Sequence, residues 1–299
     1  MITHRQEPGK RPERRINAMT VDVEDYFQVS AFENCIRRSD WDTLPGRVEA
    51  NVDRILARFE DAKISATFFT LGWVAQRYPQ MTRRIVDAGH ELASHGWSHV
   101  RVTQMARAAF AEDIRRTKGL LEEIGGSLVS GYRAPSYSIG RDNMWALEIV
   151  EQEGYRYSSS IYPIRHDLYG MPEAPRFPFV PENCRRLLEI PVTTVEVGGT
   201  RLPCGGGGYF RLFPYRVSRW AIRRVNHKCE QPAVFYFHPW EIDPDQPVQQ
   251  GLGLKTRFRH YLNLAKMEGR ICRLVKDLSW DRMDRVFLGA ADSIRAEQR

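Results

Sequence analysis

The alternation of apolar and polar positions predicts strands and helices in turn along the chain. Ile16–Val23 is a strand-like run, and apolar residues then recur at helical spacing from Val48 to Phe59. The same signals predict further strands at Ser65–Leu71, Glu91–Ser94, Leu128–Tyr132, Tyr155–Ile161, Leu187–Val197 and Ala233–Phe237. They predict further helices at Pro79–Ala88, Thr103–Ile124, Asn143–Glu153 and Pro214–Cys229. Repeated strand–helix units imply parallel strands with helices outside them, and therefore an α/β barrel or a doubly wound sheet.

Length and composition favour one globular domain with a basic tail. The chain has 299 residues, of which 42% are hydrophobic and 27% charged, values typical of folded proteins. The net charge is +7, and the five basic and two acidic residues of positions 1–15 supply +3 of it. We see no linker, and we expect 1–15 to be a disordered tail and 16–299 to be a single domain.

The chain shows no sign of secretion or of a membrane span. Residues 1–15 are polar throughout, and the most apolar window, Ala66–Ala75, is too short to cross a bilayer. The five cysteines are an odd number without a CxxC pair, which argues against both a disulfide framework and a zinc knuckle. We expect a cytoplasmic protein with no nucleic-acid partner, because no recognition motif accompanies the basic charge. Peripheral association with a membrane surface is compatible with that charge.

Three clusters of reactive side chains stand at the carboxyl ends of predicted strands, where α/β folds place their active sites. The first contains Asp22, Glu24 and Asp25, next to apolar Tyr26 and Phe27. Strand alternation would put Asp22 and Glu24 on one face. Three carboxylates within four residues indicate a catalytic base or a metal site.

The second cluster contains two histidines, His95 and His99, which are four positions apart. Their imidazoles can meet one ion if the segment turns helically. Two imidazoles with one carboxylate form the ligand set of a catalytic zinc or another divalent ion, because such a set leaves a coordination position open.

The third cluster combines Arg133-Ala134-Pro135 after one strand with His238-Pro239-Trp240 after another. Beside a metal site, an arginine that orients a carboxylate and a histidine that protonates a leaving group complete a hydrolytic centre. Trp240, next to His238, is a candidate for stacking on a sugar ring.

With these motifs in this order, the chain resembles the polysaccharide deacetylases with a NodB-homology domain, carbohydrate esterase family 4. The similarity spans about residues 16–240. It rests on four segments: Thr20–Asp25, Ser94–His99, Arg133–Tyr137 and Phe237-His238. The Tyr-Phe after the acidic cluster, the sequence His238–Glu241 and the segment Arg259–Tyr261 look like the deacetylases encoded beside exopolysaccharide and exosortase loci. The chain beyond about 239 would then be a family-specific extension.

The resemblance implies a distorted (β/α) barrel with fewer than eight strands. It also implies metal-dependent removal of acetyl groups from the N-acetylhexosamine units of a bacterial exopolysaccharide or a lipid-linked precursor. His95, His99 and a first-cluster carboxylate would hold the ion, and Asp22 would deprotonate the attacking water. His238 would protonate the departing amine. Pro135 and Tyr137 would contact the substrate, with a backbone N–H near Tyr137 facing the developing oxyanion.

Two departures from the usual family pattern leave alternatives open. The usual adjacent aspartates are missing, so either Glu24 or Asp25 is the carboxylate ligand. The aspartate that often orients the catalytic histidine is absent from Tyr155–Ser160. Either another group orients His238 or activity is reduced, and the second case predicts a glycan-binding protein on the same fold.

Overall fold

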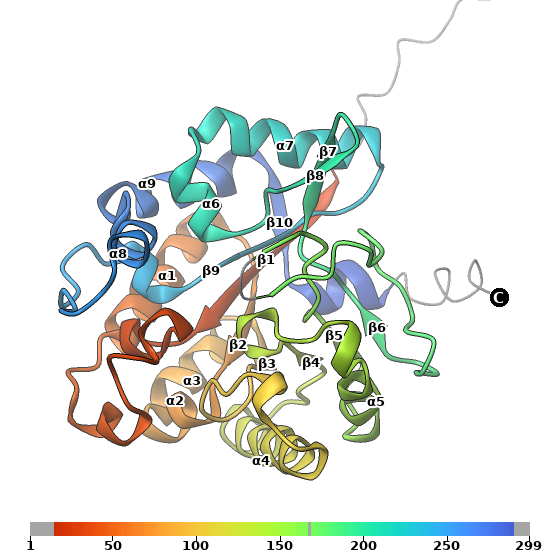
Figure 1. Cartoon of the computed structure of the whole chain (residues 1–299). Coiled ribbons are helices and arrows are strands. Elements are labelled where there is room, and N and C mark those ends of the chain that lie inside the picture. The colour runs from red at the N-terminus through yellow and green to blue at the C-terminus, as the bar shows by residue number, and fades with distance from the viewer. Residues whose placement is uncertain (1–14, 167–168, 290–299) are drawn as a thin grey trace, which may run out of the picture.

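The protein folds as a curled sheet of parallel strands with helices on its outer side (Figure 1). The computed structural model describes residues 15–166 and 169–289; the expected tail lies almost entirely outside this range. The strands of the main sheet are β1 (Ile16–Val23), β2 (Thr67–Thr70), β3 (Glu91–Ser94), β4 (Gly131–Tyr132), β5 (Tyr157–Ser158), β6 (Leu188–Glu189), β9 (Val234–Phe237) and β10 (Ser279–Asp281).

The wall of the barrel follows the order β9-β1-β2-β3-β4-β5-β6, and the short β10 pairs only with the first residues of β1. No strand pair joins β6 to β9. The chain after β6 bridges the two instead: Thr193 Oγ1 accepts a hydrogen bond from the Val234 N–H at 2.6 Å, and the Gly205 carbonyl accepts one from the Tyr236 N–H at 2.7 Å. The prediction of a distorted barrel with fewer than eight strands in its wall is confirmed.

The helices cover the outer face of the barrel because each has one apolar side. They are α1 (Val48–Ala62), α2 (Gly72–Arg77), α3 (Pro79–Asp87), α4 (Arg107–Gly125), α5 (Trp145–Gln152), α6 (Gly207–Leu212), α7 (Tyr215–Lys228), α8 (Leu254–Tyr261) and α9 (Leu264–Asp277). In α1, for example, Val52, Ile55 and Phe59 are buried against the sheet. No helix in the described part of the chain is long and apolar enough to cross a membrane.

Several boundaries differ from the sequence predictions. The predicted helix 103–124 begins only at Arg107, because Val102–Gln104 form a separate 3₁₀ turn. The predicted strand Leu187–Val197 divides into β6 and β7 (Thr194–Val197), and β7 forms an antiparallel hairpin with β8 (Thr200–Pro203). The periodicity analysis did not predict α2, α6, α8, α9 or β10.

Alternation along β1 places the catalytic candidates inside the barrel. Ala18 packs among the interior side chains, while Met19 and Val21 pack against the outer helices. Asp22 has the same parity as Ala18 and therefore points inward at the carboxyl end of the strand. This end of the barrel carries the site.

Candidate active site

Glu24, His95 and His99 gather in a buried group that has the donor set of a metal site. Glu24 follows β1, and both histidines follow β3. Each residue is at most 5% exposed, and one ligand atom from each lies within 4.8 Å of the others. The structure thus brings together both histidines of the second motif and one carboxylate of the first.

The loop that carries the two histidines is not the helical turn that their spacing suggests. Gly96 and His99 both have positive φ, 74° and 55°, and this reversal brings the two rings to a centroid distance of 5.3 Å. The backbone N–H groups of Gly72 and Trp73 in α2 donate to the carbonyls of Gly96 and Trp97, both at 2.9 Å. The first turn of α2 therefore fixes the loop.

The protonation of these side chains suits a divalent cation. The Nδ1 atom of His95 lies 2.8 Å from the Arg133 carbonyl, which can only accept, so Nδ1 carries the proton and Nε2 keeps its lone pair. Burial lowers the pKa of His95 to about 4. Burial alone would raise the pKa of Glu24, but the charges of His99 and His238 outweigh burial and lower the pKa to about 2.

One oxygen of Glu24 provides a further test of the fit. Its Oε2 atom is buried and lies 2.9 Å from His99 Nε2, but in an orientation that makes no hydrogen bond. A buried carboxylate oxygen without a hydrogen bond is costly unless a cation neutralises it. Two imidazoles and one carboxylate with an open side are the ligands of catalytic zinc and of similar ions. The residues present therefore fit a divalent metal.

Asp25, the alternative carboxylate ligand, lies outside this group. Its Oδ1 accepts the N–H of Tyr26 at 2.9 Å, and its Oδ2 accepts the N–H groups of Arg47 and Val48 at 2.7 and 3.0 Å. Asp25 therefore fastens the loop after β1 to the start of α1. Its burial raises its pKa to about 6. The geometry favours Glu24 as the ligand and gives Asp25 a structural role.

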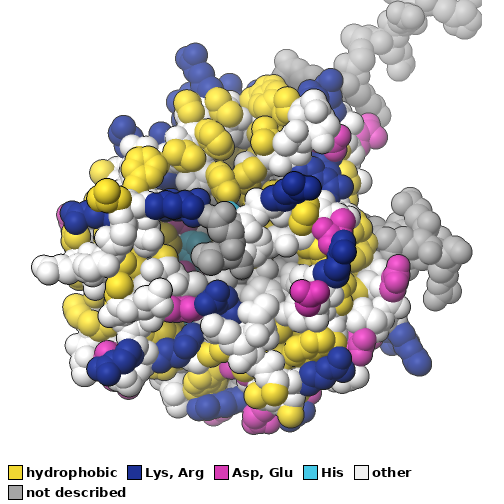
Figure 2. All heavy atoms as spheres, in the orientation of Figure 1, with side chains coloured by type: hydrophobic (Ala, Val, Ile, Leu, Met, Phe, Trp, Pro, Cys, Tyr) yellow, Lys and Arg dark blue, Asp and Glu magenta, His cyan; other side chains and the backbone are white. Residues whose placement is uncertain are grey.

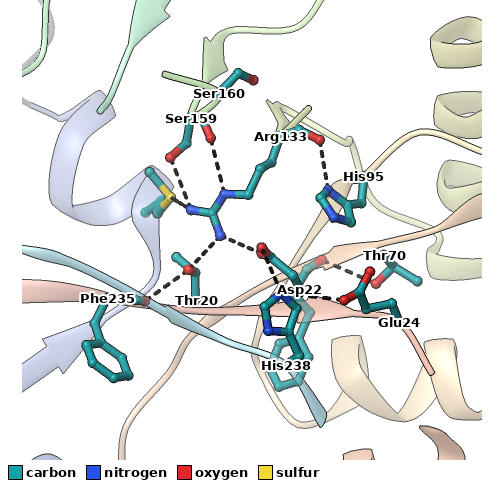
Figure 3. Close-up of polar contacts among 12 residues, drawn as sticks. Thr20, Asp22, Glu24, Thr70, His95, Arg133, Ser159, Ser160, Phe235 and His238 are labelled. Carbon is teal, nitrogen blue, oxygen red and sulfur yellow. Dashed lines mark hydrogen bonds and ion pairs between the residues drawn. The ribbon is translucent and has the colours of Figure 1, made fainter. Parts of the chain in front are cut away.

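Arg133 and Asp22 form a fully buried ion pair beside the metal-ligand group (Figure 3). Arg133 Nη1 donates to Asp22 Oδ1 at 2.5 Å and to Thr20 Oγ1 at 2.8 Å. Its other nitrogens donate to the backbone carbonyl and hydroxyl of Ser159. With Oδ1 held in this way, Asp22 Oδ2 lies 4.0 Å from His238 Nε2. Arg133 thus orients the carboxylate, as its sequence position suggested.

His238 is held by a glutamate that the sequence analysis did not assign. Glu241 Oε1 lies 2.8 Å from His238 Nδ1 and accepts the His238 backbone N–H at 3.1 Å. Glu241 Oε2 accepts from Arg211 Nε of α6 at 2.6 Å, and the glutamate is only 1% exposed. Burial lowers the pKa of His238, but the charges of Glu24, Glu241 and Asp22 outweigh it and raise the pKa to about 9.

The glycines before and within α6 allow this arrangement. A Cβ on Gly207 would lie 2.3 Å from Glu241 Oε1, and a Cβ on Gly206 would lie 2.8 Å from the Tyr236 ring. Gly205, Gly206 and Gly207 therefore pack closely against β9 and the turn after it. One signal for Glu241 was local: Pro239 opens a 3₁₀ turn, and Glu241 is the third residue of that turn.

The predicted substrate contacts are only partly in place. The reactive groups line a pocket of about 200 Å³ together with Tyr137 and Trp240. The N–H of Tyr137 itself donates to the Ala134 carbonyl at 3.0 Å. The buried Pro135 is not among the residues that line this pocket.

Trp240 lines this pocket, but other rings cover most of its surface. It is 7% exposed, and its ring stacks on both His238 and His260, at centroid distances of 5.2 and 4.3 Å. Little of the ring is therefore available to a sugar. Its Nε1 instead donates to Glu24 Oε1 at 3.2 Å, which holds the candidate metal ligand in place.

Comparison with known proteins finds two family models that match successive parts of the chain. Residues 40–158 match the model of the polysaccharide deacetylase family. This part of the chain is therefore similar to the polysaccharide deacetylase family. Residues 159–288 match a second model, described as a domain of unknown function (DUF3473). Of the residues placed at the site, His95, His99 and Arg133 lie in the deacetylase match, and His238 and Glu241 lie in the second match.

Two curated proteins are similar to part of the chain. A peptidoglycan deacetylase of Helicobacter pylori is 26% identical over 113 residues, which is 38% of each chain. A peptidoglycan deacetylase-like protein of Gibberella zeae is 28% identical over 159 residues, 50% of this chain and 46% of its own. The chain thus spans less than half the length of these relatives.

A solved structure shares the fold over nearly the whole chain. A Mycobacterium smegmatis protein classed among the polysaccharide deacetylases superposes with a TM-score of 0.60 and 19% sequence identity. The match covers 98% of this chain and 95% of that protein. The barrel of the polysaccharide deacetylases therefore extends through the DUF3473 region.

Proposed function

We propose that the chain is a metal-dependent N-deacetylase that acts on N-acetylhexosamine units of a glycan. The observation that supports this most is that Asp22 and His238 line one pocket with the donors Glu24, His95 and His99. Behind this pocket, Arg133 pairs with Asp22 and Glu241 pairs with His238. The match of residues 40–158 to the polysaccharide deacetylase model also supports this chemistry.

The chemistry needs a water made nucleophilic and an amine made able to leave. Glu24, His95 and His99 would hold a divalent ion, and such an ion would supply polarisation of the acetamide carbonyl and a lowered pKa for a nearby water. Asp22 Oδ2 accepts the proton of that water, while Arg133 holds Oδ1 and fixes the direction of the free oxygen. The water oxygen then bonds to the carbonyl carbon.

His238 acts on the other side of the same carbon. Because Nδ1 is held by Glu241, the proton that His238 donates is the one on Nε2, the atom that faces Asp22 and Glu24. The C–N bond breaks as the nitrogen takes this proton, and the products are acetate and a free amino sugar. Glu241 positions His238 and stabilises its protonated form.

The glycan-binding alternative was motivated by the aspartate missing from Tyr155–Ser160. Glu241 supplies an orienting carboxylate from a different part of the chain, and Arg211 holds Glu241 in place. The missing aspartate therefore does not argue against turnover. We therefore favour the enzyme. Zinc is our proposed ion, because histidine nitrogen with a carboxylate oxygen suits it.

The substrate that we propose is an exopolysaccharide or its lipid-linked precursor. The support is sequence similarity to the exopolysaccharide and exosortase subgroup in the acidic cluster, in His238–Glu241 and in Arg259–Tyr261. The curated relatives are named as peptidoglycan deacetylases, so peptidoglycan belongs among the substrates compared.

The experiment is acetate release from a panel of N-acetylated glycans, with the chain depleted of metal and then supplied with Zn²⁺ or other divalent ions. The panel contains chitooligosaccharides, peptidoglycan, an N-acetylated exopolysaccharide and a lipid-linked N-acetylhexosamine. Metal-dependent acetate release supports the proposal. Saturable glycan binding without acetate release, under every metal, would favour the binding protein.

A further inference from the structure

One face of the molecule exposes a group of large apolar side chains that the proposed chemistry does not use. Eleven large hydrophobic residues are exposed among the described residues, and nine of them fall between Val197 and Phe258. We call six of these the apolar face, and they are 39–88% exposed: Leu212, Phe213, Val217, Trp220, Leu254 and Phe258. Exposed apolar side chains in such a cluster mark an interaction site.

The apolar face is formed by three neighbouring helices, α6, α7 and α8. Val217 and Trp220 are one turn apart on α7, whose other side is buried in the core. Leu212 of α6 and Phe258 of α8 line the same groove. Arg211 Nη1 fastens the two helices together by donating to the carbonyls of His260 and Leu262, both at 2.8 Å. Figure 2 shows hydrophobic side chains over α6 and α7, with Lys and Arg among them.

The segments that form the apolar face are rich in basic residues, of which Arg211 and Arg219 are paired with Glu241 and Asp277. The segments 205–229 and 246–267 together contain ten Lys or Arg residues and no Asp or Glu. Among the exposed ones are Arg216 and Arg223 on α7 and Lys255 and Arg257 on α8. Arginine and lysine around exposed aromatic and leucine side chains are typical of surfaces that lie in the headgroup region of an anionic membrane.

This face opens directly beside the catalytic pocket. The groove between α6 and α8 has a volume of about 210 Å³, and Tyr169 and Tyr236 line both the groove and the pocket that contains Asp22 and His238. In Figure 2 the hollow that contains histidine lies next to the hydrophobic cluster. A ligand that touches the apolar face is therefore close to the reactive groups.

We propose that the apolar face docks on the surface of an anionic lipid bilayer. Phe213, Trp220 and Phe258 enter the headgroup region, and the surrounding Lys and Arg residues contact lipid phosphates. Docking places the catalytic pocket at the surface where a lipid-linked sugar is presented. This consequence rests on the proposed function, whereas the docking itself is independent of that function.

Two other occupants fit the face less well. A second copy of the chain would bring the exposed Arg216, Arg223, Lys255 and Arg257 against the same residues of the other copy, and like charges across an interface oppose association. A free acidic polysaccharide would pair with the Arg and Lys residues and stack on the aromatic rings, but it would leave Leu212, Val217 and Leu254 in water. An anionic bilayer satisfies both features.

The test is co-sedimentation of the full chain with vesicles of phosphatidylcholine containing about one third phosphatidylglycerol, compared with phosphatidylcholine alone. One variant combines Trp220→Ser with Phe258→Ser, and a second combines Arg216→Glu with Arg223→Glu. Leu128→Ser, at an 84% exposed apolar residue elsewhere, is the control for the first. Arg37→Glu with Arg156→Glu changes the net charge equally and is the control for the second. Thermal unfolding checks that each variant folds.

We expect binding to the anionic vesicles only. Since each basic residue near such a surface contributes about fivefold in affinity, the double arginine variant should bind at least ~25-fold more weakly. The double serine variant should bind at least ~10-fold more weakly, and neither control should change.

Three results would overturn the proposal. The first is equal binding to neutral and anionic vesicles, or none to either. The second is tight binding to a soluble acidic polysaccharide that Trp220→Ser with Phe258→Ser does not weaken. The third is a wild-type dimer that these serine substitutions dissociate. Because the readout is sedimentation, each of these results leaves the question of deacetylase activity untouched.

Discussion

Replacement of Glu241 by glutamine tests how the catalytic histidine is held. Glu241 accepts from two donors, His238 Nδ1 at 2.8 Å and Arg211 Nε at 2.6 Å, one on each carboxylate oxygen. Glutamine has the same shape but only one oxygen. Whichever way its amide turns, the NH₂ group faces His238 or Arg211 in place of an acceptor.

The size of the effect follows from the hydrogen bond that is lost. A buried hydrogen bond to a charged group contributes about 1.5–3 kcal/mol, and we expect this contribution to help orient and charge His238 in the transition state. Glu241→Gln should therefore lower kcat for amide cleavage ~10- to 100-fold. Acetate release from an activated acetyl ester should fall less, because that leaving group needs no proton. Bound metal should stay at the wild-type level, since Glu241 is not among the three donors.

Asp243→Asn is the matched control. Asp243 lies at the end of the same turn as Glu241, is 1% exposed, and pairs with Arg47 rather than with His238. The control should lower the melting temperature as a broken buried ion pair does while amide kcat stays within about threefold of wild type. A Glu241→Gln enzyme with the wild-type kcat for amide cleavage would refute the reasoning. So would a Glu241→Gln enzyme whose amide and ester rates fall by the same factor and no further than those of Asp243→Asn.

Three further predictions concern individual residues. Glu24→Gln should lose its bound metal, as measured by elemental analysis, whereas Asp25→Asn should keep it. Asp25→Asn should instead lower the free energy of unfolding in urea by about 1–2 kcal/mol, because Asp25 accepts backbone N–H groups at the start of α1. The reverse pattern would identify Asp25 as the metal ligand. His238→Ala should keep its metal and lose ~10²–10⁴-fold in amide kcat but less on an activated ester, and equal losses would exclude a general acid. Burial lowers the pKa of His90 to about 4, and its Nδ1 accepts the Ala66 N–H at 3.1 Å. The unfolded chain binds a proton on His90 below about pH 6.5, whereas the folded chain does so only near pH 4. The free energy of unfolding should therefore fall by ~2 kcal/mol between pH 7.5 and 5.0 because of His90. His90→Asn should reduce this dependence of stability on pH, and an unchanged dependence would contradict the role of His90.

The parts of the site that depend on local periodicity could be predicted from the sequence. Alternation along β1 placed Asp22 inside the barrel, and the positions of His95, Arg133 and His238 after strands brought them to one end of it. These predictions succeed because parallel strands all end at the same edge, so residues far apart in sequence meet there.

The details that depend on backbone turns and on distant partners could not be predicted. Alternation cannot say where the chain leaves the strand, and only the turn after Val23 directs Asp25 toward the start of α1. The two residues with positive φ, Gly96 and His99, bring the histidines together without a helix. Arg211 reaches Glu241 from 30 positions away, and no local pattern indicates such a pair.

The most direct test of the central claim measures both products of the reaction on one N-acetylated substrate. The wild-type chain, loaded with one equivalent of Zn²⁺, is incubated with the substrate that responds in the panel, and acetate and new primary amine are quantified together. The account predicts equal amounts of acetate and amine, none after metal removal, and none from Glu24→Gln. Acetate and amine formation that survives both metal removal and Glu24→Gln would contradict it, as would complete inactivity of the metal-loaded chain on every glycan of the panel.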